Sequence, residues 1–320
     1  MSSTFTAIAK PIKLSPKSRE EWLSLRQGIG SSEIATILAL NKWETPYQLW
    51  LRKTGQTPPK TESFAMKAGH YLEDAVSLFW QDESGRQVIK SSSAENIYVH
   101  PEKDFLRVSP DRTYWIPGMT KNDDNKGILE CKTTQMPVDG DDLPMYWFAQ
   151  VQYQMGVMQK EQGSIAWLQG GREFGYKDVA LVPDFYEYLV EEAEKFWFVN
   201  VQGRVEPDMI SSEDVLLKYA KHFDGKIVEA PESLVFELSR LKDVKEQIKE
   251  LDAKKDEIEE YTKLFMMDAE ALMYSGQSLA TWKAAKDSQK FDTKAFEKKH
   301  PELYSQFLVN TAGSRRFLLK

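Results

Sequence analysis

Apolar and polar positions alternate in two stretches, residues 105–115 and 127–134, and this pattern predicts a β-hairpin. The first stretch reads FLRVSPDRTYW and the second GILECKTT, with a turn-rich segment, TKNDDNKG, leading into the second. Side chains point alternately to the two faces of a strand. Glu130 and Lys132 are therefore expected to share one face of the second strand, and Leu129 the other.

Asp111 lies in the first stretch, so pairing of the two strands would bring its carboxylate close to Glu130 and Lys132. Two carboxylates can hold Mg²⁺, which takes oxygen ligands and keeps several waters. A neighbouring lysine can orient or deprotonate a water molecule, or stabilise charge on a phosphate. These residues indicate a metal site, and the alternative is a plain solvated sheet face.

Helical periodicity and capping residues predict further elements on both sides of the hairpin. Helices are expected at residues 18–28, 33–40, 46–55, 66–85, 145–158 and 184–207, and strands within 88–105 and at 164–171 and 176–183. Glu73 borders the apolar stripe of the fourth helix and is expected to point into a cleft beside the sheet. An ordinary glutamate at a helix edge is the alternative.

Glutamines are frequent in the fifth helix, MYWFAQVQYQMGVM. Gln150 and Gln154 fall on one side of it, and Gln152 lies nearby. Amide side chains among aromatic residues and methionines indicate a helix that reaches something polar from a mostly buried position. Core packing with exposed glutamines is the alternative.

Glycines and serines precede the second helix, in the segment GIGSSE. Ser31 or Ser32 is expected to cap this helix. Free backbone N–H groups at a helix start can bind a phosphate, and Arg26 just upstream could add a charge-assisted bond. An ordinary cap in a connection between two helices is the competing interpretation.

Composition narrows the protein class. At 320 residues the chain can form one large domain or two ordinary ones. The net charge of −7 argues against nonspecific coating of nucleic acid but permits a local positive channel, because phosphate attraction acts over about 10 Å. A single cysteine excludes an intrachain disulfide framework and four-cysteine metal sites. No signal peptide or membrane-spanning run is found, so we expect a cytoplasmic protein.

The chain is expected to divide into a flexible N-terminal arm (1–17), a compact domain (18–206) and a C-terminal extension (207–320). In the extension, a long helix is predicted from Glu232 to Gly276. Val244, Leu251, Ile258 and Phe265 recur at seven-residue spacing, about two good heptads in all. A helix along the first domain, or a helical hairpin, is favoured over a dimeric rod.

Basic residues gather after the long helix. They are Lys283, Lys286, Lys290, Arg315 and Arg316. Contact with a nucleic-acid backbone and a plain solvated face are both open interpretations. LATWKAA and the final SRRFLLK are expected to form strands that pair, with a helix between them.

Five motifs occur in order within residues 20–205. They are Arg26-x-Gly-Ile-Gly-Ser-Ser, Gly69-x-x-Leu-Glu73, Ser-Pro-Asp111, Leu-Glu130-Cys-Lys132 and Ala-Gln150-Val-Gln152-Tyr. In this order and spacing they resemble the YqaJ-type viral recombinase family, the lambda-type alkaline exonuclease branch of the PD-(D/E)XK nucleases. The C-terminal extension also resembles the tail of longer YqaJ-like phage proteins.

The resemblance implies an α/β (α+β) fold with a restriction-endonuclease-like core, in which a central mixed sheet is flanked by helices and followed by a C-terminal helical extension. Residues 18–206 would be the nuclease domain. The activity implied is Mg²⁺-dependent 5′→3′ digestion of one strand of duplex DNA, with two ions and with Mn²⁺ as an alternative metal. A ring-shaped homotrimer, a single-strand-annealing partner protein and the host cytoplasm of a phage-encoded protein are implied as well.

The resemblance also assigns roles to residues. Asp111, Glu130, Glu73 and the backbone carbonyl of Cys131 would hold the metal. Lys132 would position or activate the attacking water.

Four further positions take supporting roles from the resemblance. Gln150 or Gln152 would support the metal site, and Arg26 with Ser31 or Ser32 would hold the 5′ phosphate. In an ungapped match the family's phosphate-binding serine falls near Glu33. Ser31 and Ser32 therefore both stay candidates.

Three other functions compete with the exonuclease. A restriction-like endonuclease would share the core and cut internally. A DNA-binding recombination accessory protein would have a vestigial metal site, which the presence of Asp111, Glu130 and Lys132 argues against. A CRISPR-adaptation-type nuclease normally uses four cysteines, and this chain has one.

Overall fold

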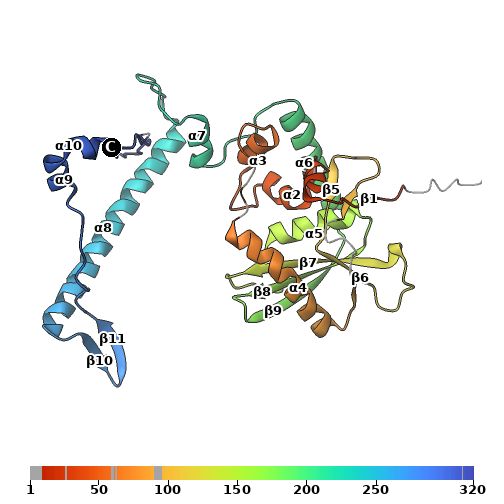
Figure 1. Cartoon of the computed structure of the whole chain (residues 1–320), viewed down its shortest axis with the longest axis horizontal. Helices are drawn as coiled ribbons and strands as arrows, with labels where there is room; N and C mark the ends of the chain where they lie inside the picture. Colours follow the sequence, from red (N-terminus) through yellow and green to blue (C-terminus); the bar gives the residue numbers. More distant parts are fainter. Residues whose placement is uncertain (1–8, 26, 59–60, 62, 90–95, 312) are drawn as a thin grey trace, which may run out of the picture. The chain divides into compact units, whose positions relative to one another are not determined.

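The computed structural model describes residues 9–25, 27–58, 61, 63–89, 96–311 and 313–320. The chain forms two compact units, Met1–Lys218 and Tyr219–Lys320 (Figure 1). The first unit extends past residue 206 because α7 (Ser212–Lys218) is tied to it by Asp214. The buried carboxylate of Asp214 accepts hydrogen bonds from Thr45 Oγ1 at 2.7 Å and Gln48 Nε2 at 3.1 Å.

A five-stranded mixed sheet in the order β3-β6-β7-β8-β9 forms the centre of the first unit. Its strands are β3 (Val88–Ile89), β6 (Arg112–Trp115), β7 (Lys126–Thr134), β8 (Gln162–Gln169) and β9 (Glu173–Ala180). The predicted hairpin is confirmed for residues 112–115, since β6 and β7 pair antiparallel and 3-10 turn η1 (Asp123–Asn125) lies between them. It is wrong for the start of the first stretch, because β5 (Leu106–Val108) belongs to a second sheet. β7 and β8 run parallel, because α5 (Met145–Val157) provides the crossover between them.

Helices cover both faces of this sheet (Figure 1). Side chains alternate along β7 as expected: Ile128 packs in the core that α5 completes, whereas Leu129 and Cys131 pack against Val76 and Trp80 of α4 (Phe64–Ser84). Two further helical segments, α6 (Pro183–Glu194) and the π-helical η2 (Lys195–Gln202), follow β9, and α6 packs on α5. The predicted mixed sheet flanked by helices is therefore confirmed.

A smaller sheet in the order β1-β4-β5-β2 extends the first unit. Its strands are β1 (Ile12–Leu14), β2 (Ile29–Gly30), β4 (Ile97–Val99) and β5 (Leu106–Val108), and the helices nearby in the chain are α1 (Arg19–Ser24), α2 (Ser31–Ile37) and α3 (Pro46–Lys53). The prediction of a flexible arm over residues 1–17 is wrong for β1. These three residues pair antiparallel with β4, which gives their backbone regular partners.

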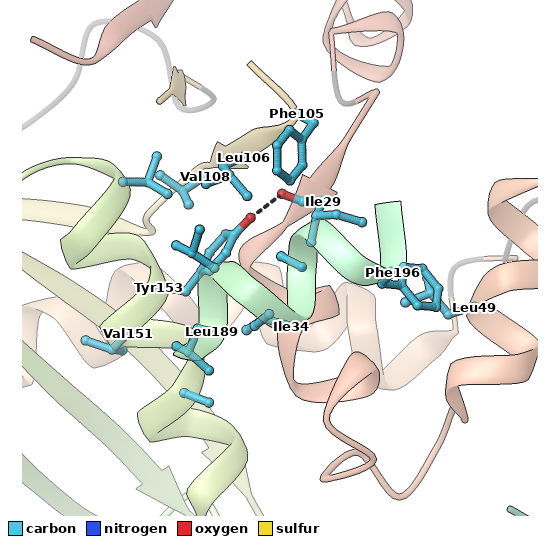
Figure 2. Close-up of a cluster of buried hydrophobic side chains, with 14 of the residues drawn as sticks. Ile29, Ile34, Leu49, Phe105, Leu106, Val108, Val151, Tyr153, Leu189 and Phe196 are labelled. Carbon is cyan, nitrogen blue, oxygen red and sulfur yellow. Dashed lines mark hydrogen bonds between the residues drawn. The ribbon is translucent and has the colours of Figure 1, made fainter. Parts of the chain in front are cut away.

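The segment before α2 is held tightly against β5. Gly28 has φ +125°, and a Cβ atom there would lie 2.3 Å from the Phe105 carbonyl oxygen, so this approach requires glycine. Ile29 N–H donates to the same oxygen at 2.7 Å. Tyr153 of α5 then donates its hydroxyl to the Ile29 carbonyl at 3.0 Å, inside the apolar core (Figure 2). The start of α2 is thereby fixed relative to α5.

The second unit contains one long helix, α8 (Glu232–Met266), and smaller elements after it. They are β10 (Ala271–Tyr274), β11 (Gln277–Thr281), α9 (Thr293–Lys299) and α10 (Pro301–Gln306). α8 is continuous, so the predicted helical hairpin is wrong. The heptad residues of α8 from Val244 to Phe265 are exposed.

The prediction that the long helix continues to Gly276 is also wrong. Ser275 and Gly276 have φ values of 48° and 81°, which suit a two-residue hairpin turn between β10 and β11. β11 therefore pairs with β10, and the described part of the final SRRFLLK segment forms no strand. Among the described residues, no helix has the length and apolar character needed to cross a bilayer.

Candidate active site

The candidate site forms where β7 continues past the first residue of β6. β6 pairs with only the first part of β7, up to the Arg112–Leu129 pair. Asp111, immediately before β6, takes over the next position: its Oδ2 accepts a hydrogen bond from Cys131 N at 2.7 Å. The carboxylate thus substitutes for a missing strand partner and is placed beside Glu130 and Lys132.

Glu130 is the most enclosed carboxylate of the group, with 2% of its surface exposed. Lys132 Nζ lies 2.6 Å from its Oε1, and Gln150 Nε2 donates to the same oxygen. The amide of Gln154 donates to Oε2 at 2.8 Å. Each carboxylate oxygen therefore has a donor, which offsets the cost of burying the charge.

The charges of the three carboxylates interact. Burial, with added repulsion from Glu130 and Glu73, raises the pKa of Asp111 well above its usual range. Burial also raises the pKa of Glu73, although His70, whose Nδ1 lies 3.0 Å from Glu73 Oε1, opposes this shift. Glu73 of α4 thus lies within electrostatic reach of Asp111 and Glu130, and its role as a metal ligand stays a prediction.

Lys132 is charged in this arrangement. Burial alone would lower its pKa, but the carboxylates of Glu130 and Asp111 outweigh burial and raise it. Its ammonium group also donates to Gln150 Oε1 at 2.8 Å. A lysine with a raised pKa is a poor base at neutral pH, but it can stabilise negative charge or orient a water molecule.

The glutamine-rich helix α5 supplies two residues to the site. The candidates were Gln150 and Gln152, whereas the observed residues are Gln150 and Gln154. Gln150 and Gln154 are one turn apart on α5 and both contact Glu130. Gln152 does not: its amide donates to the Ala180 carbonyl and accepts from Val182 N, both at 2.8 Å. Assigning Gln152 to the site is wrong, because residues two apart on a helix point in nearly opposite directions.

Gln154 is the site residue that the five motifs did not include. It is fully buried, and its Nε2 lies 3.3 Å from Ser31 Oγ as well as 2.8 Å from Glu130. Its Oε1 has no hydrogen-bond partner among the described residues. The sequence signal for Gln154 is its spacing of four residues from Gln150, which places both side chains on the same face of α5.

The serines at the start of α2 have different environments. Ser31 is buried and linked to Gln154, whereas Ser32 is exposed. Neither caps the helix: Gly30 is the N-cap, and its N–H donates to Glu33 Oε2 at 2.8 Å. The predicted serine cap is therefore wrong. Arg26 lies outside the described residues.

Two basic residues of α3 balance the negative charge of the buried Glu33 carboxylate. Lys53 Nζ lies 2.7 Å from Glu33 Oε2, and Arg52 Nη1 lies 3.3 Å from Oε1. Burial would raise the pKa of Glu33, but these two cations outweigh it and lower the pKa. The start of α2 is consequently fixed by an internal ion-pair network.

The donor chemistry of the site fits a hard divalent cation. Asp111, Glu130 and Glu73 offer oxygen ligands only, and burial, with added repulsion between the carboxylates, raises the pKa values of Asp111 and Glu73, so a bound cation would favour their ionised forms. Across the described part of the chain, no three His, Cys, Asp or Glu side chains are already arranged to hold an ion. The bonds from Lys132 and the glutamines to Glu130 explain this, and metal binding would require these side chains to shift.

Comparison with known proteins identifies the family. The profile of the YqaJ-like viral recombinase domain matches residues 21–161, a range that includes every candidate residue of the site. The "Uncharacterized protein YqaJ" of Bacillus subtilis (strain 168) is 34% identical over 320 residues, covering 96% of each chain. This chain belongs to the YqaJ-like viral recombinase family. The predicted family is confirmed, and the similarity to the Bacillus YqaJ protein includes the second unit.

Solved structures with a similar chain course include exonucleases. The alkaline exonuclease LHK-Exo from Laribacter hongkongensis is 17% identical, with a TM-score of 0.44, over 63% of this chain and 97% of that one. A putative exonuclease from Eubacterium rectale is 12% identical, with a TM-score of 0.40, over 69% of this YqaJ-like chain and 96% of the other.

Proposed function

We propose that this YqaJ-like protein is a Mg²⁺-dependent exonuclease that digests one strand of duplex DNA from a 5′ end. The observation that carries the proposal is the convergence of Asp111, Glu130 and Lys132 beside the start of β6, with Glu73 within electrostatic reach. Acidic oxygens beside a charged lysine suit hydrolysis of a phosphodiester, which develops negative charge as water attacks.

Each residue has a part in this reaction. Asp111 and Glu130 would hold the metal with the Cys131 carbonyl, and Glu73 would complete the site from α4. A bound divalent ion supplies Lewis acidity and lowers the pKa of water. Lys132, anchored by Glu130 and Gln150, orients the attacking water and stabilises charge on the phosphate.

Linear and circular duplexes test the proposal directly. With Mg²⁺ present, one strand of a linear duplex should be digested progressively from its 5′ end, while covalently closed circles stay intact. Cutting of circles would instead establish a restriction-like endonuclease. No cleavage of either DNA with Mg²⁺ or Mn²⁺ would contradict a nuclease function.

A 5′ phosphate should accelerate digestion. If Arg26 and a serine at the start of α2 bind this group, a 5′-hydroxyl end should be digested about tenfold or more slowly, because hydrogen bonds to charged groups contribute about 1.5–3 kcal/mol. Rates measured on matched duplexes check this. The exposed Ser32 is the serine that a phosphate can reach directly, so Ser32→Ala should reduce the difference between the two ends, and equal rates on both ends in the wild type would refute the phosphate site.

Substitutions of the two buried glutamines, Gln154 and Gln152, should distinguish a residue of the active site from one that only stabilises the fold. Gln154→Leu removes a donor from Glu130, and digestion is expected to slow by about 10–100-fold, the usual cost of removing a residue that orients a metal ligand. It should also lower the free energy of unfolding by about 1–3 kcal/mol, because Glu130 Oε2 loses its donor, although the unpartnered Oε1 of Gln154 is removed too. Gln152→Leu is the matched control.

Gln152→Leu leaves the buried Ala180 carbonyl and Val182 N–H without their partner. We expect it to destabilise the protein by about 1–3 kcal/mol with little change in digestion rate at temperatures where it is folded. Initial digestion rates distinguish the two variants, and urea unfolding measures the stability of each. Equal activities for both would remove Gln154 from the site.

The biological setting is proposed on the same basis. Digestion of one strand leaves the other exposed, which is the substrate of a single-strand-annealing protein, and we propose such a recombinase as the partner in phage-type recombination. A homo-oligomer, with a trimer favoured, would enclose the duplex and keep digestion processive without a strongly basic surface. Light scattering of the full chain and of its mixture with the partner tests both points.

A further inference from the structure

The charge of the chain is unevenly distributed. Residues 282–320, here called the tail segment, contain nine Lys and Arg residues and four Asp and Glu residues, whereas the whole chain has a net charge of −7. The tail segment is therefore a positive region within an acidic protein. Such a region attracts polyanions, and nucleic acid is the polyanion with the highest charge density.

Cations on α8 and in the tail segment have different partners. Four cations of α8 are paired within the helix. Arg240 lies 2.9 Å from Glu237 and Lys255 lies 3.1 Å from Asp252, and Lys249 and Lys263 lie 3.4 and 3.0 Å from glutamates. The positive charge of α8 is thus largely compensated locally.

In the tail segment such compensation is sparse. Lys283 lies 3.4 Å from Glu270, and Arg315 donates to the Tyr219 carbonyl at 3.2 Å. No hydrogen bond or ion pair with a described residue is found for Lys286, Lys290, Lys294, Lys298, Lys299, Arg316 or Lys320. These charges remain available to an external anion.

Exposed aromatic side chains accompany the charges. Phe291, Phe307 and Phe317 of the tail segment are 67%, 75% and 71% exposed. Cations that follow a phosphate backbone, combined with aromatic rings on which bases stack, are the means by which proteins bind single-stranded nucleic acid. The bases of a duplex are already stacked on one another, so exposed rings favour the single strand.

We propose that the tail segment binds single-stranded DNA, with its uncompensated cations along the phosphates and its exposed phenylalanines against the bases. The tail segment belongs to the second unit, whereas the carboxylate site is built from residues of the first unit. The tail segment would hold a DNA strand whether or not the protein hydrolyses it, so the proposal stands apart from the nuclease function.

The test measures binding of a fluorescent oligothymidylate to the full chain by anisotropy. EDTA is present throughout, so cleavage does not interfere. The first variant combines Lys286→Gln, Lys290→Gln, Lys294→Gln and Arg316→Gln. Its matched control changes four cations of α8, Arg240→Gln, Lys249→Gln, Lys255→Gln and Lys263→Gln, and so alters the net charge equally.

We expect the tail variant to bind at least about tenfold more weakly and the control to bind like the wild type. The slope of log K against log salt concentration should become shallower by about 0.7 for each phosphate that the variant no longer neutralises. A second variant, Phe307→Ser with Phe317→Ser, should bind about fivefold or more weakly with an unchanged salt dependence, because it removes the stacking rings and keeps the charge.

Three results would overturn the proposal. Equal weakening by the tail variant and the α8 control would show a general charge effect. Wild-type affinity of the phenylalanine variant would exclude stacking. Equally tight binding of a blunt duplex, with the same response to both tail variants, would exclude a preference for single strands. Circular dichroism melts of all variants establish that each is folded.

Discussion

Replacing Lys132 with methionine is expected to slow strand digestion by about 10³-fold or more. Methionine keeps the unbranched stem and removes the ammonium group that contacts Glu130 Oε1 and Gln150 Oε1. Loss of one preorganised electrostatic group in an enzyme site commonly costs about 10²–10³-fold, and Lys132 both orients water and stabilises the phosphate in the proposed reaction. Initial rates at saturating Mg²⁺ measure the effect.

The same substitution should leave a folded protein of lower stability. Glu130 loses an ion-pair partner at a buried position, which is usually costly, but it keeps donors from Gln150 and Gln154. Lys177→Met is a suitable control, because Lys177 is 41% exposed and pairs with Asp141 on the surface. Digestion by the Lys132 variant within tenfold of wild type would remove the lysine from the mechanism.

Local alternation was enough to predict the centre of the site. On β7, Glu130 and Lys132 share the α5 side while Leu129 packs toward α4, as period-2 patterning requires. The position of Asp111 was also predictable, since a hairpin places it beside the second strand. What the pattern could not show is that β6 begins only at Arg112, so that no β6 residue pairs with Cys131 and the Asp111 side chain accepts a hydrogen bond from its N–H.

Features that depend on distant contacts were predicted less well. Two serines after two glycines give a strong local cap signal, yet Glu33 bonds the Gly30 N–H because Lys53 and Arg52 of α3 compensate its charge. Those contacts are not visible in the local pattern.

The length of α8 was overestimated for a local reason instead. Ser275-Gly276 is a local turn signal, and the residues on its two sides pair as β10 and β11. The information that ends the helix before this turn is therefore present in the sequence.

Asp111→Asn is expected to abolish digestion and to stabilise the protein without divalent ions. Asparagine can still accept the hydrogen bond from Cys131 N but carries no charge. Its neutral oxygen is a weak metal ligand, so the loss of activity should be complete within the assay. Trade-offs of this kind are common where a charged site is held in an unfavourable environment.

The stability gain should depend on pH in a defined direction. The pKa of Asp111 is raised in the folded protein by burial and by Glu130 and Glu73, so its ionised form destabilises the fold at pH values above that raised pKa. As the pH falls through it, the wild-type carboxylate takes up a proton and the penalty shrinks. It vanishes below the unfolded-state pKa, where Asp111 is protonated in both states. The variant should therefore melt higher at neutral pH and equal the wild type in acid.

Calorimetric melts over a pH series, with and without Mg²⁺, measure this difference. Each kcal/mol gained should raise the melting temperature by about 2–4 °C for a unit of this size. Mg²⁺ should stabilise the wild type and leave the variant unchanged, since binding to the folded state alone shifts stability. Asp141→Asn is the control of opposite sign, because Lys177 lowers the pKa of Asp141 and its charge is favourable. A lower melting temperature for Asp111→Asn at neutral pH would contradict the expectation that burial and repulsion together make the ionised form of Asp111 unfavourable.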